Sequence, residues 1–506
     1  MTATAPDWVR YYADRYPDRI ALTDADTDDD TLWGELEERV ARLAGGLRDD
    51  VGLQRGDRVA VIADAHPNVF ALQFACFRAG LVFMPLNWRL AVAELAHMCA
   101  DAGAAALVHD DTWATLATDT AEAAGVTRRI DGAAVEVLVK GSDPMEPSGA
   151  NRLDDPAQIL YTSGTTGFPK GAVSTHGTML WNMMNGAEGK ALAAPGVNVY
   201  NPLPLFHAGG LNSTANPVLM NGGRVTTAAR FDPAAALRTI SDPAIGITHI
   251  GLVPVMYQAI ADQPGFDAAD LSGIRNAVIA GGLAPVPLLR RFAAKGLQLE
   301  AHYGGTEMGP SVLALHPSIP EKLEAGSVGR PVPYTSVRLV DGEGRDVPDG
   351  DEGEIWIKGP SVTPGYWGIE SAGFFTDGWF RTGDVARRDG DGFYYLVDRV
   401  KDMYKSGGEN VYPAEVERLL LEHPSIAEVA IVSVRDERWG EVGLAVVVAA
   451  SGATVTIETL TDAIEGRLAR YKHPKHVVVV EALPRNVTGK VDKVALRAEH
   501  GGSSVA

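Results

Sequence analysis

The stretch YTSGTTGFPKG, residues 161–171, follows the apolar pair Ile159 and Leu160 and predicts a strand that runs into a loop built to hold phosphate. Glycines in such a loop let backbone amides approach an anion without a Cβ in the way. Hydroxyl side chains add further donors, and Lys170 adds a fixed positive charge. The candidate phosphate-binding residues of the loop are Ser163, Gly164, Thr165, Thr166, Gly167 and Lys170.

A P-loop is the obvious alternative for this stretch, and three positions argue against it. A P-loop has Gly immediately before its Lys, Ser or Thr immediately after it, and a helix beyond. Here Pro169, which has no N–H group, precedes Lys170, Gly171 follows it, and AVSTH predicts a second strand. We therefore expect a lid over the outer phosphates of ATP rather than a kinase or GTPase cradle. A plain Ser/Thr/Gly surface turn is the other interpretation.

The composition is that of a globular protein. The chain has 506 residues, of which 46% are hydrophobic and 22% charged, and this length allows about three domains or lobes. A net charge of −20 disfavours nucleic acid and anionic membrane surfaces as partners, because both require a positive field. The chain starts without an apolar signal segment, and nowhere do about 18 apolar residues run together. We expect a soluble, unexported, cytoplasmic protein without integral membrane association.

The first 156 residues predict helices and strands in alternation. Helical spacing of apolar residues covers 7–22 and 31–48, with an acidic turn, DADTDDD, between them. Strands are expected in GDRVAVIADAH and AGLVFMPLN, and a polar loop over 141–156 leads to the phosphate-binding stretch. Cys76 and Cys99 lie in apolar helical segments, so we interpret both as reduced core residues.

The remaining chain continues the α/β pattern and then changes. Strands are expected in VNVYNPLP, GRVTTAA, ITHIGLVP and AVIAGG, and then, closely spaced, in SVRLVD, GEIWIKG and GFYYLVD. Beyond residues 398–417 come strands in EVAIVSV, GLAVVVAAS and HVVVVEALP and a helix at about 456–469. The predicted fold is α/β, with a large N-terminal domain of two α/β sheet lobes and a small β-rich lobe, followed by a small mobile α+β C-terminal domain.

Further motifs follow the phosphate-binding stretch in a fixed order: AHYGGTEMG at 301–309, GWFRTGD at 378–384 and LPRNVTGKVDK at 483–493. Together with that stretch, they resemble the signature motifs of the adenylate-forming superfamily. This superfamily includes acyl-CoA synthetases, aryl-CoA ligases, luciferases and peptide-synthetase adenylation domains. The resemblance covers essentially the whole chain.

The resemblance implies roles for the nucleotide-binding residues. Tyr303 is expected to pack on adenine, Thr306 to bind the α-phosphate, and Asp384, with Arg399 as companion, to bind the ribose hydroxyls. Mg²⁺ prefers carboxylate and other hard oxygen ligands, and the resemblance assigns it to Glu307 with Thr162. The remaining residues assigned to ATP or AMP are Gly281 and Gly282 of the AGGLAP loop, with Leu283 where a small residue is more usual, and Gly304.

The resemblance also implies a site for the acid. His207, in YNPLPLFHAGG, is expected to gate this pocket, although an isolated His after Phe is often a satisfied core residue. The other candidate pocket residues are Val253, Gly281, Gly305, Met308 and Trp181 to Met184. Few charges occur among them, which disfavours a second carboxylate on the substrate. Medium-chain aliphatic and aromatic acids both stay open.

The predicted domains are residues 1–398, which would bind ATP and the acid, and residues 399–506. In the C-terminal domain the resemblance implies a hinge at Lys401 and a catalytic lysine at Lys490, with Val487 where Pro is common. Rotation at the hinge would present Lys490 in one half-reaction and the SGGEN segment in the other. The expected CoA-binding residues are Ser406, Gly407, Gly408 and Trp439.

The sequence therefore predicts an ATP- and Mg²⁺-dependent ligase that converts a small carboxylic acid to acyl-AMP, releases pyrophosphate and forms acyl-CoA. One alternative passes the activated group to the pantetheine of a carrier protein. Another passes it to an amine or a further nucleophile, or activates an anion such as nitrite. A catalytically inactive nucleotide-binding relative is disfavoured, because Lys170, Glu307 and Lys490 are all present. Monomer and homodimer both stay open.

Overall fold

The phosphate-binding stretch lies between two strands, as expected. A computed structural model of the chain describes residues 3–162, 169–189, 192–193, 196–282, 286–399, 404–411, 413–484 and 491–500. Strand β7 (Pro156–Thr162) enters the stretch and strand β8 (Lys170–Thr175) leaves it. The predicted strand after Lys170 is therefore confirmed, and a P-loop helix at this position is excluded.

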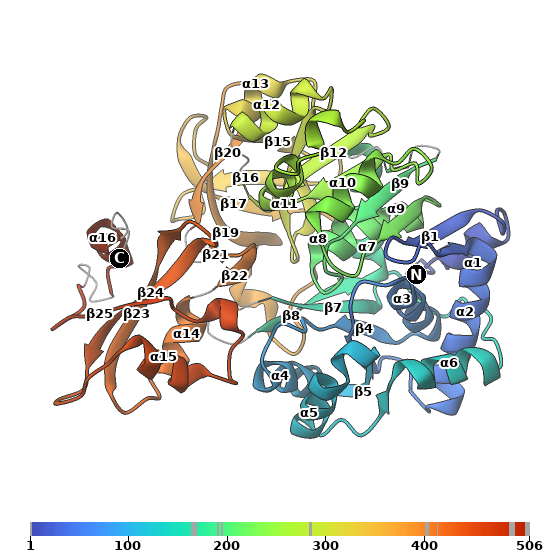
Figure 1. Cartoon of the computed structure of the whole chain (residues 1–506), viewed down its shortest axis with the longest axis horizontal. Coiled ribbons are helices and arrows are strands. Elements are labelled where there is room, and N and C mark those ends of the chain that lie inside the picture. Colours follow the sequence, from blue (N-terminus) through green and yellow to red (C-terminus); the bar gives the residue numbers. More distant parts are fainter. Residues whose placement is uncertain are drawn as a thin grey trace. The chain divides into compact units, whose positions relative to one another are not determined.

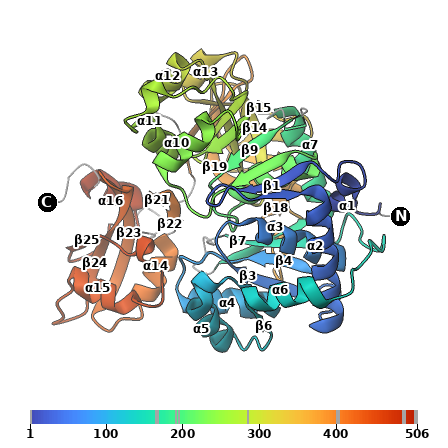
Figure 2. The same ribbon diagram turned by 45° about the vertical axis from the view of Figure 1, so that its right-hand side comes forward.

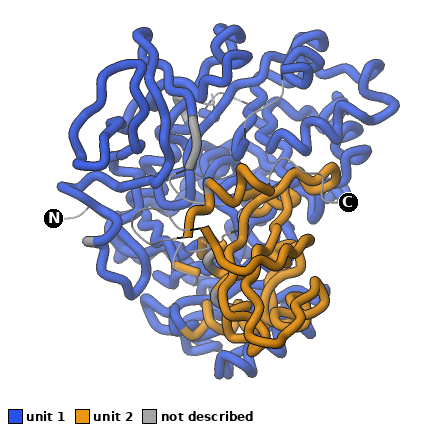
Figure 3. The backbone as a smooth tube through the Cα atoms, turned by 90° about the vertical axis from the view of Figure 1, so that its left-hand side faces the viewer, with its two compact units in different colours: residues 1–87, 101–160, 171–398 blue, residues 88–100, 161–170, 399–506 orange. Residues whose placement is uncertain are grey.

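The chain divides into two compact units, coloured separately in Figure 3. Unit 1 comprises residues 1–87, 101–160 and 171–398. Unit 2 comprises residues 399–506 together with two short segments, 88–100 and 161–170. The mixed α/β class, with a large N-terminal and a small C-terminal part, is confirmed. The functional division at residue 398 stays a prediction.

The first lobe of unit 1 is built on a six-stranded sheet in the order β6-β5-β3-β4-β7-β8. Strand β3 pairs parallel with β4 and β5, β4 pairs parallel with β7, and β5 pairs parallel with β6. Burial of four successive residues in β3 and β4 reflects a sheet that is covered on both faces. Besides β7 and β8, the strands of this six-stranded sheet are β3 (Arg58–Ile62), β4 (Val82–Pro85), β5 (Ala104–His109) and β6 (Arg129–Ile130).

The second sheet of unit 1 has fourteen strands in the described residues, and its central part is parallel. The order there is β13-β12-β11-β9-β10-β1, with β2 antiparallel at the edge. The acidic run of residues 24–30 forms the turn of the β1–β2 hairpin, as expected. These strands are β1 (Ile20–Asp24), β2 (Asp30–Leu32), β9 (Asn198–Asn201), β10 (Arg224–Thr227), β11 (His249–Leu252), β12 (Asn276–Ala280) and β13 (Leu299–Gly305).

The predicted β-rich lobe continues this second sheet rather than forming a separate one. Strand β14 pairs antiparallel with β13 and then with β15, and the sheet runs on through β20, β19, β17 and β16. Its strands are β14 (Gly309–Leu315), β15 (Ser327–Pro331), β16 (Ser336–Val340), β17 (Glu352–Lys358), β18 (Phe375–Thr376), β19 (Trp379–Arg388) and β20 (Tyr394–Arg399).

The helices of unit 1 pack on both sheets. Helix α3 shows the local signals well: His66 caps its first turn, Pro67 is its first residue, and Gly80 ends it at φ 70°. Helices α10, α11 and α12 lie side by side on one face of the parallel strands (Figures 1 and 2). The α-helices are α1 (Trp8–Ala13), α2 (Trp33–Gly45), α3 (Pro67–Ala79), α5 (Ala114–Ala124), α6 (Gly132–Gly141), α7 (His176–Gly189), α8 (Ala208–Gly210), α9 (Asn216–Met220), α10 (Pro233–Ser241), α11 (Pro254–Ala261), α12 (Val286–Ala294) and α13 (Pro320–Glu324).

Five shorter helical turns complete unit 1. They are η1 (Gly46–Asp50), η2 (Asp111–Trp113), η3 (Leu211–Ala215), η4 (Phe266–Ala268) and η5 (Ser371–Gly373). A buried network of amide side chains crosses unit 1, in which Asn212 donates to Gln158 of β7 at 2.6 Å and Asn216 donates to Asn212 at 2.9 Å. Because buried amides need partners, this network ties the first lobe to the helices of the second.

Unit 2 is an α+β unit with a five-stranded sheet in the described residues. Its long hairpin, β23–β24, is antiparallel, and β25 pairs parallel with β24. The strands are β21 (Tyr404–Ser406), β22 (Glu409–Val411), β23 (Ile426–Asp436), β24 (Gly440–Ala449) and β25 (His476–Val479). The helices are α4 (Val92–Ala102, of which residues 92–100 belong to this unit), α14 (Pro413–Leu420), α15 (Ile457–Ile464), η6 (Arg470–Lys472) and α16 (Lys493–His500).

Two predicted helices were too long. The helix expected over 7–22 ends at Ala13, and residues 20–24 form β1 instead. Pro17 cannot donate the next helical hydrogen bond, and the β-branched and apolar run after it pairs with β10. The helix expected to reach about residue 469 ends at Ile464, since Gly466 takes φ 71°.

The predictions for the cysteines are confirmed. Cys76 lies in α3 and Cys99 in α4, and both are buried and free. Burial raises the pKa of the Cys99 thiol to about 12, so the thiol stays protonated at neutral pH. No helix in the described part of the chain combines the length and apolar character that crossing a bilayer requires.

Candidate functional site

Four candidate residues lie at one edge of the second sheet. Strands β9, β11, β12 and β13 are parallel neighbours, so their carboxyl ends meet at the same edge. His207 follows β9, Val253 and Gly281 directly follow β11 and β12, and Gly305 ends β13. Strand β9 also has β10 on one side and β11 on the other, which makes it a topological switch point. Ligands of open α/β sheets bind at such points, outside the carboxyl ends.

A tight turn after β13 carries the Tyr-Gly-Gly-Thr-Glu motif. Gly305 pairs with Gly309, and Gly309 takes φ 73°. A Cβ on Gly304 would lie 2.5 Å from the carbonyl oxygen of Pro310, so this glycine is required by the packing of the hairpin itself. A Cβ on Gly305 would lie 2.9 Å from the terminal methyl of Met308. Thr306 and Glu307 occupy the half-buried turn.

Glu307 is oriented by a loop that leaves β17. The Tyr366 hydroxyl donates to Oε1 of Glu307 at 2.9 Å, and the backbone N–H of Thr363 donates to the carbonyl of Glu307 at 2.8 Å. The Thr363 hydroxyl donates to the carbonyl of Val173 in β8, and the backbone N–H of Trp367 donates to Gly171. The loop therefore joins the Glu307 turn to the strand that leaves the phosphate-binding stretch.

The donor chemistry at Glu307 fits Mg²⁺. A half-buried carboxylate with one oxygen held by a phenol presents hard oxygen to a cation, and Mg²⁺ in nucleotide sites commonly takes one or two carboxylates with phosphate oxygens and waters. No group of three or more His, Cys, Asp or Glu side chains in the described residues forms a complete protein cage. Such a cage is not needed where phosphates supply ligands.

Asp384 is placed by an irregularity in β19. Between Arg381 and Val385 the register against β17 shifts, and Gly383 takes φ 73° there. Such bulges re-aim a side chain. The Asp384 side chain is buried, at 4% exposure, and its Oδ2 accepts a 2.6 Å hydrogen bond from the Tyr303 hydroxyl. The two residues predicted to hold ribose and adenine therefore touch.

Two ring pairs lie at the candidate pocket positions. Trp181 of α7 meets Tyr334 edge to face, with ring centroids 5.1 Å apart, and His207 meets Phe206 at 4.7 Å. The His207 side chain is exposed, whereas Met183 and Met308 are buried. The exposure of His207 disfavours the alternative that it is a core residue, and its expected role as a pocket gate stays a prediction.

The candidate CoA-binding residues of unit 2 lie on a short hairpin. Ser406 ends β21, and Gly407 and Gly408 form the turn into β22 at φ 59° and 85°. The Gly407 N–H donates to the carbonyl of Trp439 at 2.9 Å, and a Cβ on Gly407 would lie 2.7 Å from the indole ring. Trp439 is 39% exposed. Its indole therefore covers the glycine turn and stays partly exposed rather than filling a core, with the Arg438 guanidinium 4.8 Å from the ring centroid.

Some of the predicted site residues flank the phosphate-binding loop, and others lie outside the residues that the structure describes. Thr162 ends β7 and Lys170 begins β8, so both flank the phosphate-binding loop. The predicted residues that lie outside the described residues are Ser163, Gly164, Thr165, Thr166, Gly167, Leu283, Lys401, Val487 and Lys490, together with the side chain of Arg399. Gly282 follows Gly281, and both are exposed.

Sequence reasoning missed Tyr366 and Thr363, which contact Glu307. Both lie in the run SVTPGYWG, residues 361–368. An aromatic pair inside a Pro/Gly-rich loop was the available signal, because binding and catalytic residues are often carried on loops. Their partner, however, is 56 to 59 residues away in the sequence.

Comparison with known families and proteins agrees with this geometry. A model described as AMP-binding enzyme matches residues 9–367, and one described as AMP-binding enzyme C-terminal domain matches residues 415–490. A feruloyl-CoA synthase from Amycolatopsis sp is 43% identical over 479 residues, covering 93% of this chain and 94% of the relative.

Two further relatives cover nearly the full length. An indoleacetate–CoA ligase from Aromatoleum aromaticum is 38% identical over 501 residues, covering 97% of each chain. A solved structure of a double mutant of o-succinylbenzoate CoA synthetase from Bacillus subtilis, bound with its product analogue, is 32% identical with a TM-score of 0.87. It covers 97% of this chain and 98% of that one.

Proposed function

Since the chain belongs to the AMP-binding enzyme family, we propose that its acid substrate is an aromatic carboxylic acid. The chain is an ATP-dependent carboxylic acid:CoA ligase of the AMP-forming kind, and its cofactors are ATP, Mg²⁺ and coenzyme A. We also propose roles for single residues and a rotation of the C-terminal domain between the two steps.

The reaction has two balanced steps. In the first, a carboxylate oxygen attacks the α-phosphorus of ATP, the bond to the β-phosphate oxygen breaks, and acyl-AMP and pyrophosphate result. In the second, the CoA thiol loses its proton and its sulfur attacks the acyl carbon, while AMP leaves. A free carboxylate is a poor electrophile, so the mixed anhydride supplies the good leaving group that the thiol needs.

The residues at the carboxyl edge of the second sheet suit the first step. Asp384 would accept hydrogen bonds from the ribose hydroxyls, and its contact with Tyr303 orients both side chains. Thr306 would donate to the α-phosphate. Glu307, held by Tyr366, would bind Mg²⁺, which supplies charge neutralisation for the phosphates. The glycines of residues 163–171 would bring backbone N–H groups to the outer phosphates.

The C-terminal residues would divide between the two steps. Lys490 would stabilise the charge that develops around the α-phosphate during adenylation. Rotation at Lys401 would then bring the Ser406–Gly408 hairpin to the acyl-AMP. Gly407 and Gly408 leave room for the narrow pantetheine arm, and the exposed face of Trp439 would lie along it.

The observation that carries the aromatic class is the pair of curated relatives, both of whose names specify an aromatic acid. The chain's own residues are consistent with it, because Trp181 and His207 present rings at candidate pocket positions. Edge-to-face ring contacts favour an aromatic guest beyond the area that it buries.

A pyrophosphate-release screen tests this proposal. Purified enzyme with ATP and Mg²⁺ is given hydroxycinnamic, arylacetic and medium-chain aliphatic acids, each with and without free CoA. We expect release and thioester formation to be fastest with an aromatic acid and CoA. Preference for an octanoate-like acid would contradict the aromatic class. Adenylation that yields thioester only with a carrier protein, or amide only with an amine, would support one of the other acceptors.

A matched pair of variants tests the ribose assignment. Asp384→Asn loses a charged acceptor for two ribose hydroxyls, each worth roughly 1.5 to 3 kcal/mol, so the KM for ATP should rise strongly. Asp391→Asn is the control, because Asp391 is exposed and bonds Lys322 instead. Equal ATP affinity in both variants would remove Asp384 from the site.

A cytoplasmic location, where ATP and CoA are supplied, is part of the proposal.

A further inference from the structure

We propose that Lys472 is a positioning residue for thioester formation, which clamps the α4 segment to the hairpin that carries Ser406, Gly407 and Gly408. The inference rests on the proposed function, because it assigns Lys472 to one of the two half-reactions. Lys472 would touch neither substrate. It would act through the placement of the hairpin in the orientation used by CoA.

The contact itself lies inside unit 2. The Lys472 ammonium group donates to Oε1 of Glu94 at 2.6 Å and to Oε1 of Glu415 at 2.9 Å. The side chains of Lys472, Glu94 and Glu415 are only 2%, 6% and 4% exposed. Oε2 of Glu94 also accepts the buried backbone N–H of Ala469, at 2.9 Å. Glu94 thus satisfies two donors that lie more than 370 positions further along the chain.

Two carboxylates, Glu409 and Glu415, lie at the two ends of the segment that follows the hairpin turn. Glu409 begins β22, directly after the turn of Gly407 and Gly408, and pairs with Arg89 of the 88–100 segment. Glu415 lies in the first turn of α14, just beyond β22. The Arg89–Glu409 pair and the Lys472 clamp therefore fasten the two ends of the segment that leaves the proposed CoA-binding turn. If the clamp opened, the turn would lose its fixed position relative to α4.

The chemistry of the clamp suits a contact that forms and breaks. Buried ion pairs are seldom more stabilising than an apolar contact of the same size, because both ions lose their hydration. Once separated, however, an ammonium group and two carboxylates are well solvated, whereas an exposed apolar patch would not be. The hydrogen bonds also restrict the arrangement, since Glu94 must meet Lys472 and the Ala469 N–H while Lys472 also meets Glu415. A charged clamp thus defines one orientation without preventing release.

The test separates the two half-reactions in the full-length enzyme. Adenylation is followed as pyrophosphate release with acid and ATP, and thioester formation as acyl-CoA made from synthetic acyl-AMP and free CoA. Lys472→Met should slow thioester formation by about tenfold or more, the scale of losing a charged hydrogen bond, and leave adenylation within about twofold. Lys472→Arg keeps the charge and should recover part of the loss.

Two Glu→Gln variants, one at the clamp and one away from it as a control, should disturb the fold little. Glu94→Gln leaves Lys472 with one carboxylate, so thioester formation should fall by severalfold. Glu422→Gln alters an exposed pair with Arg467 that lies wholly within residues 399–506, and it should change neither step. Thermal unfolding of each variant confirms that it is folded.

Equal slowing of both half-reactions by Glu94→Gln in a folded enzyme would overturn the proposal and leave a structural role. Unchanged thioester formation in both Lys472→Met and Glu94→Gln would overturn it as well. A wild-type enzyme that forms no thioester from acyl-AMP and CoA would instead contradict the CoA acceptor itself, so the two failures are distinguishable.

Discussion

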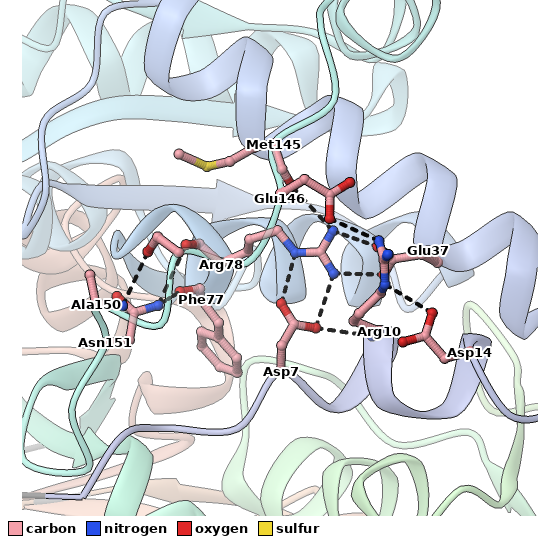
Figure 4. A network of polar contacts seen from close by, with 11 residues as sticks. Asp7, Arg10, Asp14, Glu37, Phe77, Arg78, Met145, Glu146, Ala150 and Asn151 are labelled. Carbon is pink, nitrogen blue, oxygen red and sulfur yellow. Dashed lines mark hydrogen bonds and ion pairs between the residues drawn. The ribbon is translucent and has the colours of Figure 1, made fainter.

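Among the described residues, each unit of this protein has a buried cation between two carboxylates, and the two clusters differ in how fully the cation is bonded. In unit 1 the cation is Arg78, which meets Asp7 and Glu37 (Figure 4). In unit 2 it is Lys472, which meets Glu94 and Glu415. The cations are 1% and 2% exposed, so burial is nearly the same for both.

The guanidinium of Arg78 uses all five of its N–H donors. Nε and Nη2 donate to Asp7, Nη1 and Nη2 donate to Glu37, and Nη1 also donates weakly to the carbonyl of Met145 at 3.5 Å. Arg10, which pairs with Glu37 and Glu146, adds a second positive charge (Figure 4). The paired hydrogen bonds from Arg78 to each carboxylate, together with the charge of Arg10, leave little unbalanced charge. This arrangement suits a permanent anchor for the N-terminal segment.

The ammonium of Lys472 makes only single bonds to its two carboxylates. Both carboxylates are also more deeply buried than those of unit 1. The side chains of Glu94 and Glu415 are 6% and 4% exposed, against 20% for Asp7 and 12% for Glu37. Burial, with repulsion from Glu94, raises the pKa of Glu415 to about 7 against the attraction of Lys472. An arginine with paired hydrogen bonds to two carboxylates thus makes a static anchor. A lysine with single hydrogen bonds to two more deeply buried carboxylates makes a contact that responds to pH.

The largest expected effect comes from removing the cation of unit 1. Arg78→Ala removes the paired hydrogen bonds of Asp7 and Glu37, which keep only their single contacts with Arg10, and this should lower the free energy of unfolding by about 3 to 5 kcal/mol. Urea unfolding measures this loss. Arg345→Ala, which breaks only exposed pairs with Asp341 and Glu343, is the control and should cost at most about 1 kcal/mol. A similar small loss for Arg78→Ala would show that Arg78 is not an anchor.

The next effect is the pH response of the unit 2 cluster. The folded pKa of Glu415 lies above its unfolded value, so its contribution to stability is present below about pH 4.3 and is lost as pH rises to about 7. The groups that face it are Glu94 from α4 and Lys472 and Tyr471 from η6. The total change should be about 4 kcal/mol, because a difference of one in pKa corresponds to about 1.4 kcal/mol.

Glu415→Gln should remove this pH response. The measurement is the difference in unfolding free energy between variant and wild type across that pH range, since other carboxyl groups titrate equally in both. Glu37→Gln in the unit 1 cluster leaves Glu415 in place, so this control variant should keep the loss of stability that the wild type shows as pH rises toward 7. Parallel curves for wild type and Glu415→Gln would mean that Glu415 stays ionised and that the contrast between the clusters is wrong.

A charge-conserving change in unit 1 sharpens the role of the paired hydrogen bonds. Arg78→Lys keeps the positive charge but supplies three donors in place of five, so at least one carboxylate loses its paired bonds. We expect a loss of about 1.5 to 3 kcal/mol in urea unfolding, the value of one hydrogen bond to a charged group. If Arg78→Lys unfolds like wild type, charge rather than geometry explains the anchor.

The smallest effect is expected at the second cation of unit 1. Arg10 is 39% exposed, and its partners Asp14 and Glu146 are more exposed still. Pairs of this kind contribute about 0.2 to 1 kcal/mol, so Arg10→Ala should shift the unfolding midpoint only slightly. That shift should also shrink at high salt, because exposed pairs are screened. A loss as large as that of Arg78→Ala would place Arg10 within the anchor itself.

Prediction from the sequence succeeded where the signal was local. Strands β7 and β8 flank the phosphate-binding stretch because an apolar pair precedes it and Pro169 and Gly171 deny it a helix. It failed where local spacing competed with pairing to a distant strand, as at residues 20–24, which join β10 rather than extend α1. The helical period of Trp8, Tyr11 and Tyr12 gave no sign of that strand.

The candidate site shows the same division. Order and chemistry within short motifs were enough to single out Tyr303, Glu307 and Asp384, because each motif concentrates its residue types within a few positions. The partner of Glu307 was not predicted, since Tyr366 comes from a loop of its own. Whether Lys490 and Lys401 act as expected stays a prediction.

The sequence by itself determined the α/β class, the order of the motifs and the kind of chemistry, because strand periodicity, turn residues and phosphate-binding composition are all properties of neighbouring residues. Only the tertiary structure decided that Tyr303 touches Asp384, that Arg78 meets Asp7 and Glu37, and that Lys472 meets Glu94. These partners lie 41 to 378 positions apart. A charge or hydroxyl in a sequence looks the same whether water or a distant partner satisfies it, and only folding decides which of the two it is.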